Sequence, residues 1–283
     1  MRLIRKTILT LLSLLFILAP NLTLAEGDYE EGDGWEYRNG VLTIIADGGL
    51  VDFLENEPDQ DQARNNKHFG YDVSELVIGN NVNEFRMFQF VEDFCPQQIT
   101  VEKGNLNFIV TDGWLIDTRT GTLVCPSDFE AFQTIQMVND IPDCVRYVGE
   151  YAFYPHNYLK EIFIPESVIG LEKFSLAGCE ALKIVDLPTH LETINAGAFL
   201  GCTTLDEIQL GKQVKFIGEF AFEGCYYLER LNLMDTRITV LSNSLFCNCT
   251  ELRSIILPET LKTIESDSFK YCSSLESVVI SSE

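Results

Sequence analysis

The chain has 283 residues, and its 43 Asp and Glu against 20 Lys and Arg give a formal charge of −23. Binding to phosphate backbones or anionic lipid depends on basic side chains, so such an acidic chain is a poor candidate for either. We therefore expect no nucleic-acid partner.

Residues 1–25 have the pattern of a secretory signal peptide. Three basic residues precede an apolar run at residues 8–19, and small residues suit cleavage after Ala25. A membrane anchor is the alternative, but Pro20 and Asn21 interrupt the run, which is shorter than the roughly 20 apolar residues of a spanning helix. Cleavage would leave 17 basic against 43 acidic side chains, a formal charge of −26.

Residues 26–72 form an acidic segment that contains the expected N-terminal cap. Residues 26–61 hold twelve acidic side chains and one basic side chain. The apolar residues 41–45 are typical of a strand, and Asn39-Gly40 before them is typical of a hairpin turn. A repeat array follows further along the chain, and such arrays need a cap over their first coil. We assign that role to a β-hairpin within residues 33–55.

Residues 73–134 hold degenerate repeats and an inserted hairpin. The apolar pattern around Ile78 predicts one strand, and residues 99–101 predict another. A turn that contains Gly separates two further apolar stretches, residues 114–116 and residues 123–124. We expect these two stretches to form a β-hairpin.

Residues 135–283 repeat with a period of 23 residues. A leucine-like residue returns at spacings of 23, 23, 23, 23, 24 and 23, and an aromatic column and a cysteine column follow the same period. The columns are Ile141, Ile164, Leu187, Leu210, Leu233, Leu257 and Ile280; Phe153, Leu176, Phe199, Phe222, Phe246 and Phe269; and His156, Cys179, Cys202, Cys225, Cys249 and Cys272. This period predicts a β-rich solenoid, because one coil cannot bury its own apolar side and coils must stack to share a core.

Each regular unit contains a short strand in which inward and outward residues alternate, as in residues 252–257. Pro188 and Pro258 end their strands, because proline cannot donate to a strand ladder. A second inward pair follows, such as Val214 with Ile217, and fits either a second short strand or a turn of 3₁₀ helix.

Nine cysteines in an exported chain first suggest disulfides, but the number is odd and five stand in one column. Stacked coils lie about 4.7–4.9 Å apart, so neighbouring thiols come near bonding distance. Free cysteine is also a small, often buried apolar residue, and His156 takes its place in one coil. We interpret the column as a reduced, buried ladder; a bridge among Cys95, Cys125, Cys144 and Cys247 stays open.

Three phrases recur in the repeats, at residues 148–153, 162–165 and 198–202. Together with the hairpin region at residues 35–53 and the segment at residues 112–116, they resemble the BspA-like leucine-rich repeat family. The resemblance implies a leucine-rich repeat superhelix, a curved right-handed solenoid with parallel strands along one face. It also implies a secreted or surface protein of the kind associated with adhesion to host matrix proteins or to other cells, without shared catalytic residues.

Catalytic and metal-binding patterns are scarce. His68, His156 and His190 are far apart, and the sequence has no H-E-x-x-H, G-x-S-x-G, P-loop or C-x-x-C. Cys247-Asn248-Cys249 has the wrong spacing for a zinc site. We expect no enzyme activity, no cofactor and no metal, and His156 to be a buried packing residue. A nucleophilic cysteine paired with a distant histidine stays open, although nothing favours it.

Outward strand positions recur once per coil and form the candidate binding face. Its residues are Glu161, Phe163, Ile184, Asp186, Glu207, Gln209, Arg230, Asn232, Ile256 and Val279. We expect Phe163 and Ile256 to be exposed and to anchor a protein partner, as apolar surface patches often do. The alternative is that outward strand positions prefer branched and aromatic residues anyway.

These patterns predict a secreted or cell-surface, non-catalytic protein-binding or adhesion module whose ligand is a host matrix protein or another cell-surface protein. The alternative is a structural or self-associating solenoid, because the sequence after the last predicted strand shows no obvious cap and an open strand edge can pair. A secreted hydrolase would need a catalytic group that the sequence does not show.

Overall fold

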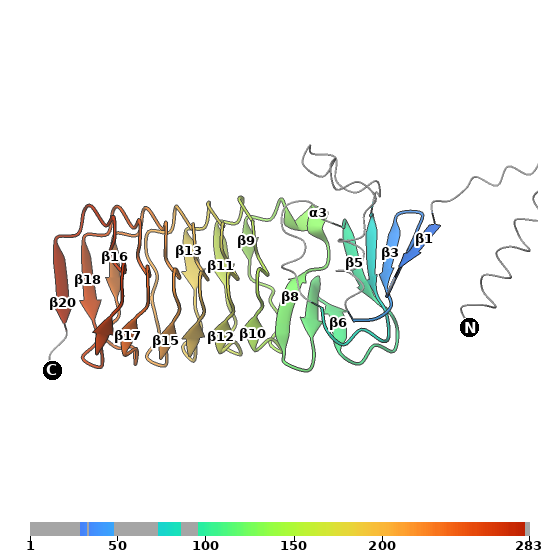
Figure 1. Ribbon diagram of the computed structural model, residues 1–283, viewed down its shortest axis with the longest axis horizontal. Helices are drawn as coiled ribbons and strands as arrows, with labels where there is room; N and C mark the ends of the chain where they lie inside the picture. Colours follow the sequence, from blue (N-terminus) through green and yellow to red (C-terminus); the bar gives the residue numbers. More distant parts are fainter. Residues whose placement is uncertain (1–28, 33, 48–72, 86–95, 281–283) are drawn as a thin grey trace, which may run out of the picture.

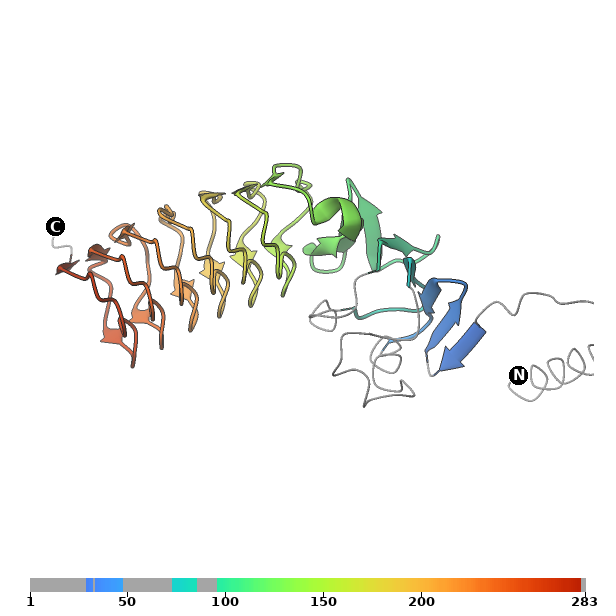
Figure 2. The ribbon, with the colours of Figure 1, turned by 90° about the horizontal axis from the view of Figure 1, so that it is seen from above.

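The structure, a computed structural model, describes residues 29–32, 34–47, 73–85 and 96–280. In this part of the chain, short strands and one short helix form coils that follow one another along a gently curved axis (Figures 1 and 2). The predicted signal peptide, residues 1–25, lies outside the described residues, and so do Cys95 and residues 48–55 of the predicted cap.

A five-stranded sheet forms the N-terminal end. Its strands, in spatial order, are β1 (Tyr29–Gly32), β2 (Trp35–Arg38), β3 (Val41–Ile44), β4 (Glu75–Ile78) and β5 (Gln98–Val101). β2 and β3 are antiparallel, and Asn39 and Gly40 between them have positive φ, which confirms the predicted hairpin turn. β3 pairs in parallel with β4, and β4 with β5, so the hairpin covers the outer edge of β4.

A three-stranded antiparallel meander follows: β6 (Phe108–Thr111), β7 (Trp114–Asp117) and β8 (Thr122–Pro126). The predicted hairpin is β7 with β8, whereas β6 is a further strand that the sequence pattern does not predict. Leu115 packs into the N-terminal core, and Trp114 and Ile116 pack into the core of the coils. Because both faces of β7 are buried, the hairpin is a wall between two cores rather than a surface insertion.

Helix α3 (Phe129–Phe132) follows β8 and was not predicted. Asp128 caps it, and its side chain accepts a hydrogen bond of 2.8 Å from the Ala131 amide. The Phe132 ring lies 5.7 Å from Trp114 and 5.8 Å from Phe153, measured between ring centroids. The helix thereby closes the first end of the solenoid core.

Two rows of parallel strands run along the coils. The first row contains β9 (Met137–Val138), β11 (Glu161–Phe163), β13 (Ile184–Asp186), β16 (Arg230–Asn232), β18 (Ser254–Leu257) and β20 (Ser277–Ile280). The second row contains β8, β10 (Tyr147–Val148), β12 (Gly170–Leu171), β14 (Thr193–Ile194), β15 (Phe216–Ile217), β17 (Val240–Leu241) and β19 (Thr263–Ile264). Of the inward pairs that fitted a strand or a 3₁₀ turn, the second residue lies in a two-residue strand, as Ile217 does in β15, whereas Val214 precedes that strand.

The aromatic and cysteine columns form the core of the coils. Phe199, Phe222 and Phe246 are fully buried, and successive rings stack with centroids 5.3 and 5.8 Å apart. Each column thiol donates a hydrogen bond to the carbonyl of the aromatic-column residue one coil earlier, at sulfur–oxygen distances of 3.1, 3.2, 3.2, 3.3 and 3.5 Å. All eight described cysteines are free, so the column thiols form no disulfide with one another in the described structure.

Both strand rows are interrupted in the coil that spans residues 205–232. Within the described coils, no backbone hydrogen bond joins residues 184–187 to residues 207–210, and residues 206–211 form no strand. The second row breaks between β15 and β17, where the repeat carries one extra residue. The turn side stays connected, as in the bond of 3.1 Å from the Phe220 amide to the Asn243 carbonyl. The expectation that Glu207 and Gln209 lie on a strand was wrong.

Candidate binding face

The first strand row presents its outward side chains to solvent, and we call this surface the strand face. Alternation places them there: Ile162, Leu231 and Ile255 point into the core, while their neighbours point away from it. The ladder break divides this surface into a β9–β13 patch and a β16–β20 patch. The β9–β13 patch consists of Met137, Glu161, Phe163, Ile184 and Asp186, and the β16–β20 patch of Arg230, Asn232, Ser254, Ile256, Ser277 and Val279.

Exposure along the strand face differs from the prediction. Ile184 and Val279 are 47% and 50% exposed, whereas Phe163 and Ile256 are only partly exposed. The two predicted anchors are covered in part because both lie in strands paired on both edges. The structure places Asp186, Arg230 and Asn232 on exposed strand positions, and Glu207 and Gln209 on the exposed coil between the two patches. Glu161 is partly exposed.

Met137 belongs to the strand face although the repeat columns did not indicate it. Its side chain is 48% exposed, and it pairs in register with Glu161, which pairs in turn with Ile184. Met137 precedes Glu161 by 24 residues, whereas the leucine-like column steps by 23 here. A step of 23 residues back from Glu161 leads instead to Val138, which is 1% exposed.

The charges of the β9–β13 patch lack partners. In the described part of the chain, the carboxylates of Glu161 and Asp186 take part in no hydrogen bond and no ion pair. Lys183 beside them pairs with Asp206 at 3.4 Å, and both side chains are well exposed. Such an exposed pair contributes little to stability. The patch therefore presents apolar side chains and two free carboxylates together.

His156 occupies the cysteine slot of the first regular coil and is buried, as expected for a packing residue. Its ring lies edge-on to Phe132, with centroids 4.3 Å apart. Burial lowers the pKa of His156, so the neutral imidazole is favoured in the folded protein. Within the described residues, its Nε2 and the indole nitrogen of Trp114 have no hydrogen-bond partner. The His156 side chain is 3% exposed, so it lies within the core rather than at the surface.

The buried thiols of Cys125 and Cys179 are poorly suited to nucleophilic chemistry. Burial raises the pKa of Cys179 to about 12 and raises that of Cys125 well above its ordinary value. Cys144 is exposed. Among the described residues, no group of three or more His, Cys, Asp or Glu side chains could hold a metal ion.

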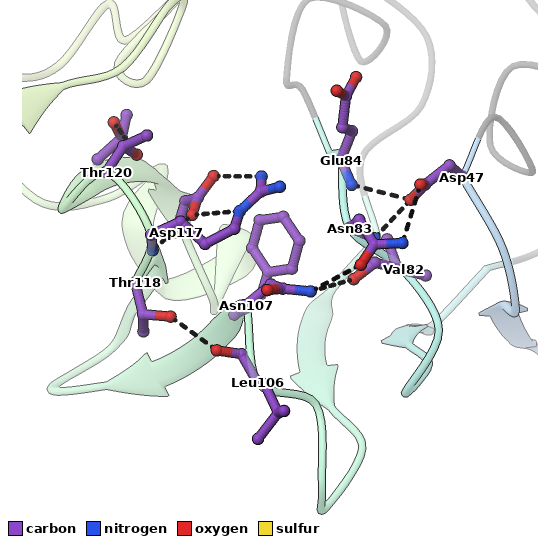
Figure 3. A network of polar contacts seen from close by, with 12 residues as sticks. Asp47, Val82, Asn83, Glu84, Leu106, Asn107, Asp117, Thr118 and Thr120 are labelled. Atoms are coloured by element: carbon purple, nitrogen blue, oxygen red, sulfur yellow. Dashed lines mark hydrogen bonds and ion pairs between the residues drawn. The ribbon is translucent and has the colours of Figure 1, made fainter.

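A polar network joins the N-terminal sheet to the meander, and Figure 3 shows it. The Asp47 carboxylate accepts hydrogen bonds from the backbone amides of Asn83 and Glu84, the latter at 2.8 Å. The Asn107 side chain donates to the Asn83 side chain at 3.0 Å. These bonds link the segments that follow β3 and β4 to the one that precedes β6. The Asp47 carboxylate and the Asn83 and Asn107 side chains bond to other parts of the same chain. We therefore interpret the network as structural.

No helix in the described residues is long and apolar enough to cross a membrane.

Comparison with known proteins agrees with this architecture. Six copies of the BspA type leucine rich repeat region match residues 127–237 and 171–283. A leucine-rich repeat protein from Eubacterium ventriosum is 21% identical with a TM-score of 0.50, over 74% of this chain and 50% of that one. The pneumococcal vaccine antigen PcpA is 21% identical with a TM-score of 0.54, over 75% of this chain and 56% of that one.

The chain thus spans about half the length of these two solved structures. At this identity the likeness shows a shared fold alone. No curated protein matches the chain. The repeat model, however, covers residues 127–283, which is more than half of the sequence. The chain belongs to the BspA-type leucine-rich repeat family.

Proposed function

We propose that this chain is a secreted or cell-surface, non-catalytic module that binds a protein through its strand face. The observation that carries the proposal is the surface of six short parallel strands on which Met137, Ile184 and Val279 are apolar and about half exposed. Apolar side chains gathered on one face of a soluble protein mark interaction sites. The ligand is a host matrix protein or another cell-surface protein, in keeping with the repeat family.

Binding to immobilised matrix proteins at physiological salt tests this function. The wild-type chain is compared with an Ile184→Asp, Val279→Asp double variant, which changes one exposed residue in each patch. Ile264→Asp, Tyr271→Asp is the matched control, because it adds the same charge at two exposed apolar residues, 51% and 64% exposed, outside the strand face. We expect saturable binding that only the double variant loses. Equal binding by all three proteins would contradict a site on the strand face.

Export is the second part of the proposal, and the sequence pattern of residues 1–25, which is typical of a secretory signal peptide, supports it. We propose cleavage after Ala25, so the mature chain begins at Glu26. Intact-mass measurement of protein recovered from the culture medium or the cell surface tests this. A product that retains Met1 would contradict cleavage.

Self-association is the alternative function, and the exposure of β20 favours it. All four residues of β20 are exposed, and this strand pairs with β18 along one edge. Open strand edges with apolar side chains are prone to pair with another chain. Sedimentation velocity at increasing concentration tests it, with Ile280→Lys as the variant. A dimer that the substitution abolishes would support this alternative, and a monomer at every concentration would exclude it.

A further inference from the structure

We propose that the β9–β13 patch binds a segment of a protein partner that carries both cationic and apolar side chains. This inference rests on the proposed function and assigns the partner's chemistry and its place on the strand face. It depends on three observations, which are the register of the patch, its unpaired carboxylates and its contrast with the β16–β20 patch.

Apolar and acidic side chains alternate across the patch. Met137, Glu161 and Ile184 stand in one register row, and Phe163 and Asp186 stand in the next row. Neighbouring strands of a sheet lie about 4.7–4.9 Å apart, so each carboxylate has an apolar neighbour in its own row. A partner that covers the apolar side chains therefore also covers Glu161.

The unpaired carboxylates decide which partner fits. A purely apolar partner would remove Glu161 from water without compensation, which is unfavourable. An anionic partner would be repelled by Glu161 and Asp186. A Lys or Arg side chain gives each carboxylate a charge-assisted hydrogen bond, while apolar residues of the same segment cover Met137 and Ile184. Only a partner with both kinds of side chain satisfies the whole patch.

The β16–β20 patch has a different character. It contains the cation Arg230, the neutral polar residues Asn232 and Ser254, and the partly buried Ile256. It therefore lacks carboxylates next to exposed apolar side chains. The negative charge of the whole chain also favours cationic partners during encounter, but it does so without selecting a site.

Three synthetic peptides of equal length test the inference on the full chain at physiological salt. The first alternates leucine with lysine, the second serine with lysine, and the third leucine with glutamate. We expect saturable, one-to-one binding of the first peptide by isothermal titration calorimetry. The second should bind at least about tenfold more weakly because it lacks apolar contacts, and the third should not bind.

Two double variants locate the site. Glu161→Gln, Asp186→Asn should weaken the leucine–lysine peptide by about tenfold and reduce the salt dependence of its binding. Met137→Ser, Ile184→Ser should weaken it by a similar factor. Glu219→Gln, Glu259→Gln is the matched control, because it removes the same charge from exposed positions outside the strand face and should leave the affinity unchanged. Circular dichroism confirms that each variant is folded.

If Glu219→Gln, Glu259→Gln weakens binding of the leucine–lysine peptide as much as Glu161→Gln, Asp186→Asn does, net charge alone attracts the peptide. That result would overturn the inference. Equal affinity for the serine–lysine peptide would overturn it as well. Either result leaves the proposed function standing if the Ile184→Asp, Val279→Asp variant still loses its protein ligand. Conversely, the proposed function itself is contradicted if the protein ligand still binds the Ile184→Asp, Val279→Asp variant and the Met137→Ser, Ile184→Ser variant.

Discussion

Truncation of Phe222 to alanine tests how the repeat core stabilises the fold. The Phe222 side chain is fully buried, and its ring stacks on Phe199 at 5.3 Å and on Phe246 at 5.8 Å, with interplanar angles of 3° and 14°. Removing a buried phenylalanine costs roughly 3–5 kcal/mol in total, and within that total each stacked aromatic pair accounts for about 0.5–1.5 kcal/mol. Because two stacked pairs are lost, we expect Phe222→Ala to lower the free energy of unfolding by about 4–5 kcal/mol.

The same substitution at Phe269 provides an internal comparison. Phe269 stacks on one neighbour, Phe246, at 5.6 Å and is only partly buried. We expect Phe269→Ala to cost roughly half as much as Phe222→Ala, since it loses one stacked pair and less burial. Urea unfolding followed by circular dichroism measures both changes. Tyr226→Ala is the surface control, with an expected change within about 0.5 kcal/mol, because this side chain is 45% exposed.

The reasoning fails if Phe222→Ala and Phe269→Ala shift the unfolding midpoint equally. Equal shifts would mean that a phenylalanine inside the column gains nothing from its second neighbour. In a solenoid, stability is approximately a sum of coil terms and nearest-neighbour terms. An unchanged midpoint for Phe222→Ala would contradict the core assignment altogether.

Three further predictions follow from the core. Burial lowers the pKa of His156, so below pH of about 6.5 the unfolded state binds more protons and the free energy of unfolding falls, by up to about 1.4 kcal/mol per pH unit. Urea titrations near pH 7 and near pH 5 measure this fall in the free energy of unfolding, and His156→Cys should make the fall smaller. An equal fall in the wild-type protein and the variant would contradict the prediction. Iodoacetamide should modify the exposed Cys144 in the folded protein but not Cys179, whose pKa burial raises to about 12, and peptide mass spectrometry would reveal any early reaction of the column. Gly149→Ala should lower stability by about 1–3 kcal/mol, because a Cβ there would lie 2.4 Å from the Leu123 carbonyl oxygen; an unchanged thermal midpoint would refute this steric argument.

The repeat core could be predicted from the sequence because each core position makes the same contact with the neighbouring coil in every repeat. Phe199 stacks on its equivalent Phe222, and the Cys202 thiol donates to the carbonyl of Leu176, the aromatic-column residue one coil earlier. The same contact is made in each coil, so the same kind of side chain recurs at a fixed spacing. The thiol hydrogen bonds follow from that stacking. The period thus indicated which residues are buried, including His156 in a cysteine slot.

The meander was harder to predict because its burial has no periodic pattern. Trp114, Leu115 and Ile116 are consecutive buried residues that face two different cores. A strand buried on both faces appears as a continuous apolar run, which periodicity cannot distinguish from other buried segments. Helix α3 has only four residues and one capping side chain, Asp128, so it gave no periodic signal either.

The binding face was predicted only in part, because strand register depends on neighbouring coils. Met137 lies outward through a one-residue shift between β9 and β11, and such a shift exchanges inward and outward side chains. The break beside Glu207 and Gln209 has no counterpart in the sequence, because residues 205–210 alternate as those of the paired coils do.

Outward residues vary because no repeating contact restrains them, and this variation gives the strand face a direction. Glu161 and Asp186 lie at one end of it and Arg230 lies beyond the ladder break, so the sign of the charge changes along the solenoid axis. A partner segment whose cationic end reaches the β9–β13 patch leaves its other end near Arg230, where an acidic or neutral residue is preferred. Reversing that segment would bring like charges together at the carboxylates. We therefore expect a partner segment that is long enough to reach Arg230 to bind in one orientation.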